Sequence, residues 1–486
     1  MSRTVGAAVL GALLVLAAAC GGTSVGSHDN EPSSQATRPE LQISQESVRL
    51  LRSESTSITV GVTGMSEADW PVSITLNPLP EGVSVGALYL RAERMSGELK
   101  LRAGDDAAPG IHHLEVVARG GDHELRRTLQ LEISGRGLAD AAWGQRGSAT
   151  LSVRNSERLT EIAVDDTGRV YASLQDRAGG LRVLRFNSDG TPDERFGADG
   201  FASLDAFEAG AILAQQDGLL VAGSTQEGTA VARLDDQGIL DASFGERGIA
   251  ALGATGSAVA IRAGEGRIHV AGGDRTLFVA SLDGKGAVLA LGSRSRNTDR
   301  SPTATVTADA AYFSWDEYDD AEELYESSLI KSDLEGAADL SFAADGIDDI
   351  IAPKVTADAR GGIIACGFKG SRIPVPAALR FEPDGARDRN WGTVQLPIST
   401  GTGGCWRVVQ AGDGLLAAAG AANLEETVFE LFLLSDDGRI DSAFGEQGAL
   451  RFRLAPLSST AIAADRESVF VGSLEDRTLT LRRYLL

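Results

Sequence analysis

The stretch that decides the fold is Asp189-Gly190-Thr191-Pro192-Asp193-Glu194-Arg195-Phe196-Gly197-Ala198-Asp199-Gly200. It recurs in residues 237–248 and 437–448 as the pattern Gly-x-x-Asp-x-x-[Phe/Trp]-Gly-x-x-Gly, which we call the marker. The marker aspartates are Asp140, Asp193, Asp241, Asp339, Asp388 and Asp441. Successive aspartates are 53, 48, 98, 49 and 53 residues apart, so the long interval equals two units. Self-similarity at a fixed period indicates a repeat architecture.

The long interval contains an eroded marker. Residues 283–291 keep an Asp-Gly turn but lose the later aspartate, aromatic residue and glycine, so we count seven units. Each unit contains four short strand patterns, of which the third is largely apolar, as in residues 219–223. Residues 479–484 align with a fourth strand, whereas residues 137–144 open the array with none before them. The sequence therefore predicts a seven-bladed β-propeller whose two ends complete one blade.

The array resembles the delta-60 repeat family of bacterial surface repeats, whose marker has the same glycines, aspartate and phenylalanine. The resemblance covers residues 137–486. It implies the repeat fold but no reaction, because the family has no assigned activity.

The marker residues have a structural explanation. Glycine permits the positive φ of tight turns, an aspartate can accept backbone N–H bonds there, and an aromatic side chain can pack between neighbouring sheets. A catalytic aspartate would not need six copies, so we interpret the marker as a joint between blades. The alternative is a Ca²⁺ loop, but the marker lacks the dense alternation of Asp and Asn typical of such loops.

The first residues predict export and anchoring. Residues 1–20 resemble a bacterial lipoprotein signal peptide, with an apolar stretch followed by Ala17-Ala18-Ala19-Cys20. The resemblance implies lipidation of Cys20, attachment to the membrane, and, with Gly21 next, transfer to an outer membrane. The alternative is an ordinary secretory signal with an incidental cysteine. Residues 21–40, rich in small polar residues, are expected to form a flexible tether.

Residues 41–135 alternate apolar and polar side chains in about seven short strands. This pattern favours an immunoglobulin-like (Ig-like) β-sandwich without the paired cysteines of antibody domains. The domain contains the histidine group His112, His113 and His123. A metal site is conceivable, but His112 and His113 are adjacent on a predicted strand and would face opposite sides. We therefore interpret them as surface histidines and expect no metal site.

Composition narrows the possible functions. The formal net charge of the 486 residues is -23, which argues against nucleic acid as a partner. The array contains one histidine, His269, and the chain has no phosphate-binding loop, dinucleotide fingerprint or zinc-spaced Cys/His set. We therefore assign no catalytic residues, expect no cofactor, and expect a monomer. A carboxylate pair in the propeller centre would still suit a glycosidase.

Residues that differ from the repeat pattern are the first candidates for a specific function. The largest departure is a candidate partner-binding loop between a third and a fourth strand, rich in acidic and aromatic residues. Its residues are Trp315, Asp316, Glu317, Tyr318, Asp319, Asp320, Glu322, Glu323, Tyr325 and Glu326. Corresponding loops also carry acids, so the sequence predicts one acidic face. The alternative is a solvated hairpin with ordinary surface charge.

Cys366 and Cys405 lie in neighbouring units and are a candidate disulfide, with two buried thiols as the alternative. Taken together, these features predict a non-enzymatic, lipid-anchored protein of the cell envelope. Its propeller would present a surface for protein or glycan binding. The alternative function is a propeller enzyme, a hydrolase or lyase, that acts on surface glycans or peptides. A carboxylate pair in the central channel would favour the enzyme, and small apolar residues there would favour binding.

Overall fold

The computed structural model describes residues 38–51, 55–104, 107, 110–154, 156–296, 302–319, 324–342, 344, 347–370, 373–422, 426–455 and 458–486. Regular structure in these ranges is β-strand apart from two short 3-10 helices, η1 (Glu67–Asp69) and η2 (Ile347–Asp349). The prediction of an all-β chain is therefore confirmed. Neither of these helices is long and apolar enough to cross a bilayer. The signal peptide predicted for residues 1–20, Cys20, and residues 21–37 of the tether lie outside the described residues.

Two sheets contain the strands from β1 to β9, and we call them the two-sheet region. The first sheet has the order β1 (Glu40–Ile43), β3 (Ser55–Thr63), β7 (Ser96–Ala103), β5 (Val83–Val85). The second has the order β2 (Ser47–Leu51), β9 (His123–Ser134), β8 (Gly110–Gly120), β4 (Val72–Asn77), β6 (Leu88–Leu90). Residues of β7 are alternately exposed and buried, because alternate side chains point to opposite faces of a sheet. The buried side chains of both sheets, such as Leu99 and Leu131, form one core.

The described strands after β9 form seven further sheets, the seven-sheet region, which we number in chain order. Sheet 1 contains β10 (Ser148–Ser152), β36 (Thr478–Leu485), β35 (Ser468–Glu475) and β34 (Ser459–Ala464). Sheet 2 contains β11 (Glu157–Val164), β12 (Val170–Asp176), β13 (Leu181–Phe186) and β14 (Phe201–Leu204). Sheet 3 contains β15 (Glu208–Gln215), β16 (Gly218–Thr225), β17 (Gly228–Asp235) and β18 (Ile249–Ala251).

The other four sheets follow the same order of strands. Sheet 4 contains β19 (Ala258–Gly264), β20 (Arg267–Gly273), β21 (Thr276–Asp283) and β22 (Val288–Ser295). Sheet 5 contains β23 (Thr303–Val306), β24 (Ala310–Asp319) and β25 (Leu324–Asp333). Sheet 6 contains β26 (Ile351–Ala357), β27 (Ile363–Lys369), β28 (Val375–Phe381) and β29 (Thr393–Gln395). Sheet 7 contains β30 (Gly404–Ala411), β31 (Gly414–Ala422), β32 (Thr427–Leu434) and β33 (Leu450–Leu454).

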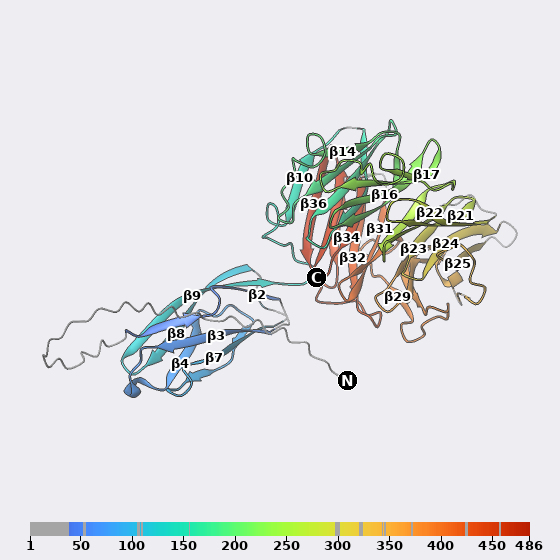
Figure 1. Ribbon diagram of the computed structural model, residues 1–486. Helices are drawn as coiled ribbons and strands as arrows, with labels where there is room; N and C mark the ends of the chain where they lie inside the picture. The colour runs from blue at the N-terminus through green and yellow to red at the C-terminus, as the bar shows by residue number, and fades with distance from the viewer. Residues whose placement is uncertain are drawn as a thin grey trace, which may run out of the picture.

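Each of the seven sheets contacts the next through one edge strand, which we call its inner strand. The contacts run from β11 to β15, β19, β23, β26, β30 and β34, and β34 contacts β11. In sheet 1, β10 from the start of the region pairs with β36 from the end of the chain, with Ala149 opposite Leu481. Figure 1 shows this pairing, with β10 in cyan beside β36 in red.

Burial on both faces explains why the sequences of the middle strands are continuous runs of apolar residues. Both faces of a middle strand pack against neighbouring sheets, so a continuous run of apolar side chains is buried there. Every residue of β32 is buried. One core combines Tyr171 of β12 with Val221 of β16, and another combines Leu220 of β16 with Val270 of β20. These cores between sheets hold the region together.

The structure differs from the expected order of strands in a unit. The strand that follows a marker is the fourth strand of the preceding sheet, as in β14, which pairs with β13. The marker therefore lies within a sheet, between its third and fourth strands. Sheet 5 has three strands in the described residues, and η2 contacts β25 there.

Candidate functional site

The marker aspartates make the same hydrogen bond. Each Oδ1 accepts the backbone N–H two residues later, at distances of 2.9 to 3.1 Å. Such a bond closes a tight turn and satisfies a donor that the turn leaves without a backbone partner. At Asp339 the hydrogen bonds from Ser341 and then from Lys331 lower the pKa of the carboxyl to about 2.

A basic residue that the sequence reading missed pairs with each marker aspartate. On the third strand of four sheets it stands eight residues before the aspartate, as Arg185, Arg233, Lys331 and Arg380. Arg483 pairs with Asp140 at 3.4 Å, and Arg136 pairs with Asp441 at 3.0 Å. In those four sheets the constant spacing of eight residues between the basic residue and the aspartate is the signal in the sequence that could have revealed the pairs.

The marker joins one sheet to the next. The glycine after the aromatic residue donates its N–H to a carbonyl in the next marker, as in Gly197 to Gln237 at 2.6 Å and Gly445 to Arg136 at 2.8 Å. The aromatic side chain lies against the first glycine of that next marker. A Cβ placed on Gly238 would lie 2.9 Å from Phe196. The same contact occurs in the pairs Trp143–Gly190, Phe244–Gly286, Trp391–Gly438 and Phe444–Gly137.

The eroded marker forms a different joint. Gly286 occupies the first glycine position, because Gly245 donates to Lys285 next to it. The aromatic position then falls on Gly292, which belongs to β22. A Cβ on Gly336, the first glycine of the next marker, would lie 2.2 Å from the Gly292 Cα. Two backbones therefore meet where other joints use an aromatic ring.

The candidate partner-binding loop is largely strand. Residues Trp315 to Asp319 belong to β24, and Tyr325 and Glu326 belong to β25, which pairs with β24 along its whole length. Asp316 is 8 % exposed, and the Trp315 Nε1–H donates to Glu317 Oε1 at 3.1 Å. Asp316 is therefore not a surface acid, because it lies within the paired part of the hairpin. Asp320, Glu322 and Glu323 lie outside the described residues.

The cysteine and histidine candidates are placed as follows. Cys366 on β27 and Cys405 on β30 form a disulfide that links sheets 6 and 7, with an S–S distance of 2.05 Å. His112 and His113 lie on β8, and His123 lies on β9 with its Nε2 3.8 Å from Asp69 Oδ2. Among the described residues, no group of three or more His, Cys, Asp or Glu side chains is arranged to hold a metal ion.

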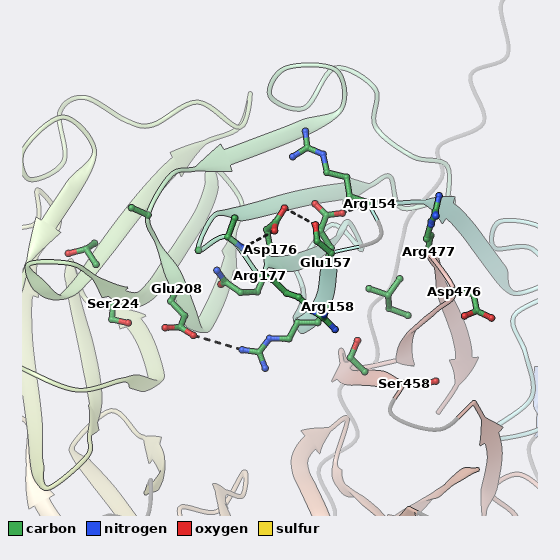
Figure 2. A pocket seen from close by; sticks show the side chains of 18 of the residues that line it. Arg154, Glu157, Arg158, Asp176, Arg177, Glu208, Ser224, Ser458, Asp476 and Arg477 are labelled. Atoms are coloured by element: carbon green, nitrogen blue, oxygen red, sulfur yellow. Dashed lines mark hydrogen bonds and ion pairs between the residues drawn. The ribbon is translucent and has the colours of Figure 1, made fainter. Parts of the chain in front are cut away.

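A groove of about 1020 Å³ lies on the face where second and third strands are joined, over sheets 1, 2 and 3. Four exposed arginines line it: Arg154, Arg158, Arg177 and Arg477. Figure 2 shows that they come from separate loops and from the start of β11. In this groove the face is mixed, because arginines stand beside the acids that the sequence places in these loops.

Three of these arginines form no salt bridge within the described residues, although the charge of Arg154 acts on Asp176. Within the described part of the chain, Arg154, Arg177 and Arg477 form no salt bridge, whereas Arg158 lies 3.9 Å from Glu208. Besides Glu208, the groove lining contains the acids Glu157, Asp176 and Asp476. Glu157 is ion-paired with Arg182 at 2.7 Å and accepts the Arg154 N–H at 2.8 Å. Hydrogen bonds from the Ala178 N–H and the Ser156 hydroxyl lower the pKa of Asp176.

The turn that carries Arg477 has an unusual backbone. Asp476 and Arg477 have φ values of 43° and 68°, between the paired ends of β35 and β36. Two positive φ values in a two-residue turn favour Asn-Gly, and other residues are strained there. The turn is held to the groove because the Val153 N–H donates to the Arg477 carbonyl at 2.8 Å. The backbone of this turn is thus held beside the groove at a conformational cost.

No family model matches the chain, and no curated protein matches it in sequence. Among solved structures, a fragment of the ICAM-5 ectodomain, domains D1–D4, aligns with 92 % of this chain and 98 % of its own, at 10 % identity and a TM-score of 0.17. Domains 4–9 of the surface layer protein SbsC align with 92 % of this chain and 82 % of their own, at 8 % identity and a TM-score of 0.16. These TM-scores are too low to carry an argument about fold or function.

Proposed function

We propose that the chain is a lipid-anchored envelope protein with an Ig-like sandwich in residues 41–135 and a closed seven-bladed β-propeller in residues 137–486. The circuit of contacts among the seven inner strands supports closure, as does the pairing of β10 with β36. The joint from Gly445 to Arg136 also supports it, because it repeats the marker contact between the last unit and the first. The lipoprotein signal and Cys20 support attachment to the outer membrane.

We further propose that the propeller binds an acidic polysaccharide of the cell envelope and performs no catalysis. The observation that carries this proposal is the groove with three exposed arginines that form no salt bridge among the described residues. Arginine binds carboxylate and phosphate through two parallel hydrogen bonds, so spaced arginines suit a polymer with repeated acidic groups. The lining also holds four carboxylates, those of Glu157, Asp176, Glu208 and Asp476, so the groove is formally neutral on a chain of net charge -23.

The test is calorimetric titration with polygalacturonate and with neutral dextran. We expect the full chain to bind polygalacturonate and not dextran, with affinity that falls as salt rises. The variant Arg154→Ser/Arg177→Ser/Arg477→Ser should bind at least about tenfold more weakly. The matched control is Arg195→Ser/Arg389→Ser/Arg439→Ser, which removes three exposed arginines from marker turns and should bind normally.

Three results would contradict this function. They are equal binding of dextran, unchanged binding by the groove variant, or binding of an acidic peptide in preference to polygalacturonate. The anchor is tested separately, by incorporation of labelled palmitate. We expect incorporation in the full chain and none in Cys20→Ser, and equal labelling of both would contradict lipidation at this cysteine.

A further inference from the structure

The inner strands of five sheets share an irregularity. Their pairing with the second strand shifts register at a β-bulge, and a bulge redirects the side chains beside it. The shifts fall between Leu159 and Glu161, Ala209 and Ala211, Ala258 and Ala260, Ile351 and Lys354, and Cys405 and Arg407. The bulge is thus a repeated device that sets which side chains face the centre of the seven-sheet region.

The residue that follows each bulge lines one central cavity. This cavity has a volume of about 430 Å³ and is lined by inner strands of six sheets, from β11 to β30. In sheets 3 and 4 the residue is Ala211 or Ala260, whereas in sheets 2, 6 and 7 it is Glu161, Lys354 or Arg407. Three units therefore depart from the small residue at this position and bring charge into the cavity.

Two of the three charges neutralise each other. Arg407 Nη1 donates to Glu161 Oε2 at 2.7 Å, and Arg407 Nη2 lies 2.6 Å from Glu161 Oε1. This ion pair, with one hydrogen bond, joins β30 to β11, whose sheets are separated by sheet 1. Glu161 is the one carboxylate among the described residues that line the cavity, and it is paired with Arg407.

Lys354 is the second cation of this cavity. Its amine forms no hydrogen bond or salt bridge with any residue in the described ranges. Burial lowers the pKa of Lys354, and the nearby carboxylate of Asp316 on β24 only partly opposes this. Strand β23 is held close to Lys354 on β26, because the Thr303 hydroxyl donates to the carbonyl of the preceding residue, Pro353, at 3.0 Å. A desolvated ammonium without a partner is costly unless an anion accompanies it.

We propose that the central cavity binds a small organic carboxylate, with the Lys354 ammonium as its counter-charge. Trp406, Ala211 and Ala260 would contact the apolar part of the ligand. The Arg407–Glu161 pair would close one side of the site. The volume lies in the range of roughly 300–1,000 Å³ of small-molecule sites. This site is separate from the arginine groove, whose lining shares no residue with the cavity.

The test uses D-galacturonate and D-galactose, which differ in one carboxylate, and calorimetric titration of the full chain at pH 7. We expect binding of galacturonate, with galactose binding roughly 10- to 100-fold more weakly. Lys354→Met should weaken galacturonate binding by a similar factor. The matched control is Lys369→Met, which removes an exposed lysine at the end of β27 in the same sheet. Thermal unfolding should show Lys354→Met to be at least as stable as the parent, because the variant removes a half-buried charge.

The pH dependence gives a second measurement. The cavity groups are Lys354, Arg407 and Glu161, with Asp316 nearby. Burial lowers the pKa of Lys354 below its ordinary value of 10.5, so affinity for galacturonate should fall as the pH rises towards 10.5 and Lys354 loses its proton. The variant of the arginine groove should bind galacturonate as the parent does. The proposal fails if galacturonate does not bind, if galactose binds equally, or if Lys354→Met or rising pH leaves the affinity unchanged.

Discussion

At the scale of the residue, the marker combines three local roles. The aspartate closes a turn, the glycine has the positive φ that the turn needs, and the aromatic ring covers the glycine of the next unit. Gly238 shows the last two of these roles. Its φ is 75°, and a Cβ added to it would lie only 2.9 Å from the Phe196 ring. The interpretation of the marker as a joint rests on such contacts. The basic partner of the aspartate lies on the third strand, outside the marker, and the marker pattern alone therefore did not reveal it.

We expect Gly238→Ala to lower the free energy of unfolding by about 2–4 kcal/mol. Left-handed backbone costs an alanine about 1–2 kcal/mol, and overpacking against a buried ring adds a similar amount. Urea unfolding followed by circular dichroism measures the loss. Gly264→Ala is the matched control, because no heavy atom lies within 4 Å of its Cβ position, and it should change stability by less than about 0.5 kcal/mol. Equal effects of the two substitutions would contradict the joint.

At the scale of the element, neighbouring sheets are tied in more than one way. Most joints use the aromatic ring of the marker, the eroded marker brings Gly292 against Gly336, and sheets 6 and 7 also share the disulfide from Cys366 to Cys405. Both cysteines are buried in a core that contains Ile364 and Leu415 of the two sheets. The cysteine pair could be proposed from sequence because it lies in neighbouring units, but its geometry depends on how β27 and β30 pack.

We expect Cys366→Ser/Cys405→Ser to lower the free energy of unfolding by about 4 kcal/mol. The two cysteines are 39 residues apart, and in the chain-entropy account a loop of that length contributes roughly this amount. The urea midpoint should fall similarly when the parent is reduced under denaturing conditions and kept reduced. Addition of reductant to the double variant is the control and should change nothing. An unchanged midpoint in the double variant would show that the bond does not restrain the unfolded chain.

At the scale of the whole molecule, the two ends of the seven-sheet region meet in sheet 1. Leu481 of β36 is fully buried between Ala149 on β10 and Gly472 on β35. Arg136 then connects the first marker to Asp441 of the last. If the propeller is closed as proposed, a defect in this sheet opens the ring and weakens distant sheets as well.

We expect Leu481→Asp to lower the free energy of unfolding by about 4 kcal/mol or more, because it buries a carboxylate without a partner. Hydrogen exchange should show lost protection in sheet 1 and also in β24 of sheet 5. Thr478→Asp, at an exposed position of the same strand, is the control and should keep the protection of both sheet 1 and β24. Loss of protection confined to sheet 1 would contradict a single cooperative ring.

The sequence by itself determined the all-β class, the period of the repeat and the turn chemistry of the marker. These features are local, because glycine conformation and the hydrogen bond from Asp193 act within a few residues. It also indicated the cysteine pair and the departure at Trp315, although it did not show that Asp316 is buried.

Only the tertiary structure decided where charge gathers. Arg154, Arg177 and Arg477 line one groove although more than half of the chain separates the last from the first two. Lys354 faces the central cavity because a bulge shifts the register of β26. A change of one residue in register moves side chains to the other face of a strand, so composition and spacing do not determine such a site. The physical reason is that these sites depend on which strands of different sheets come together, whereas the marker depends on its own neighbours.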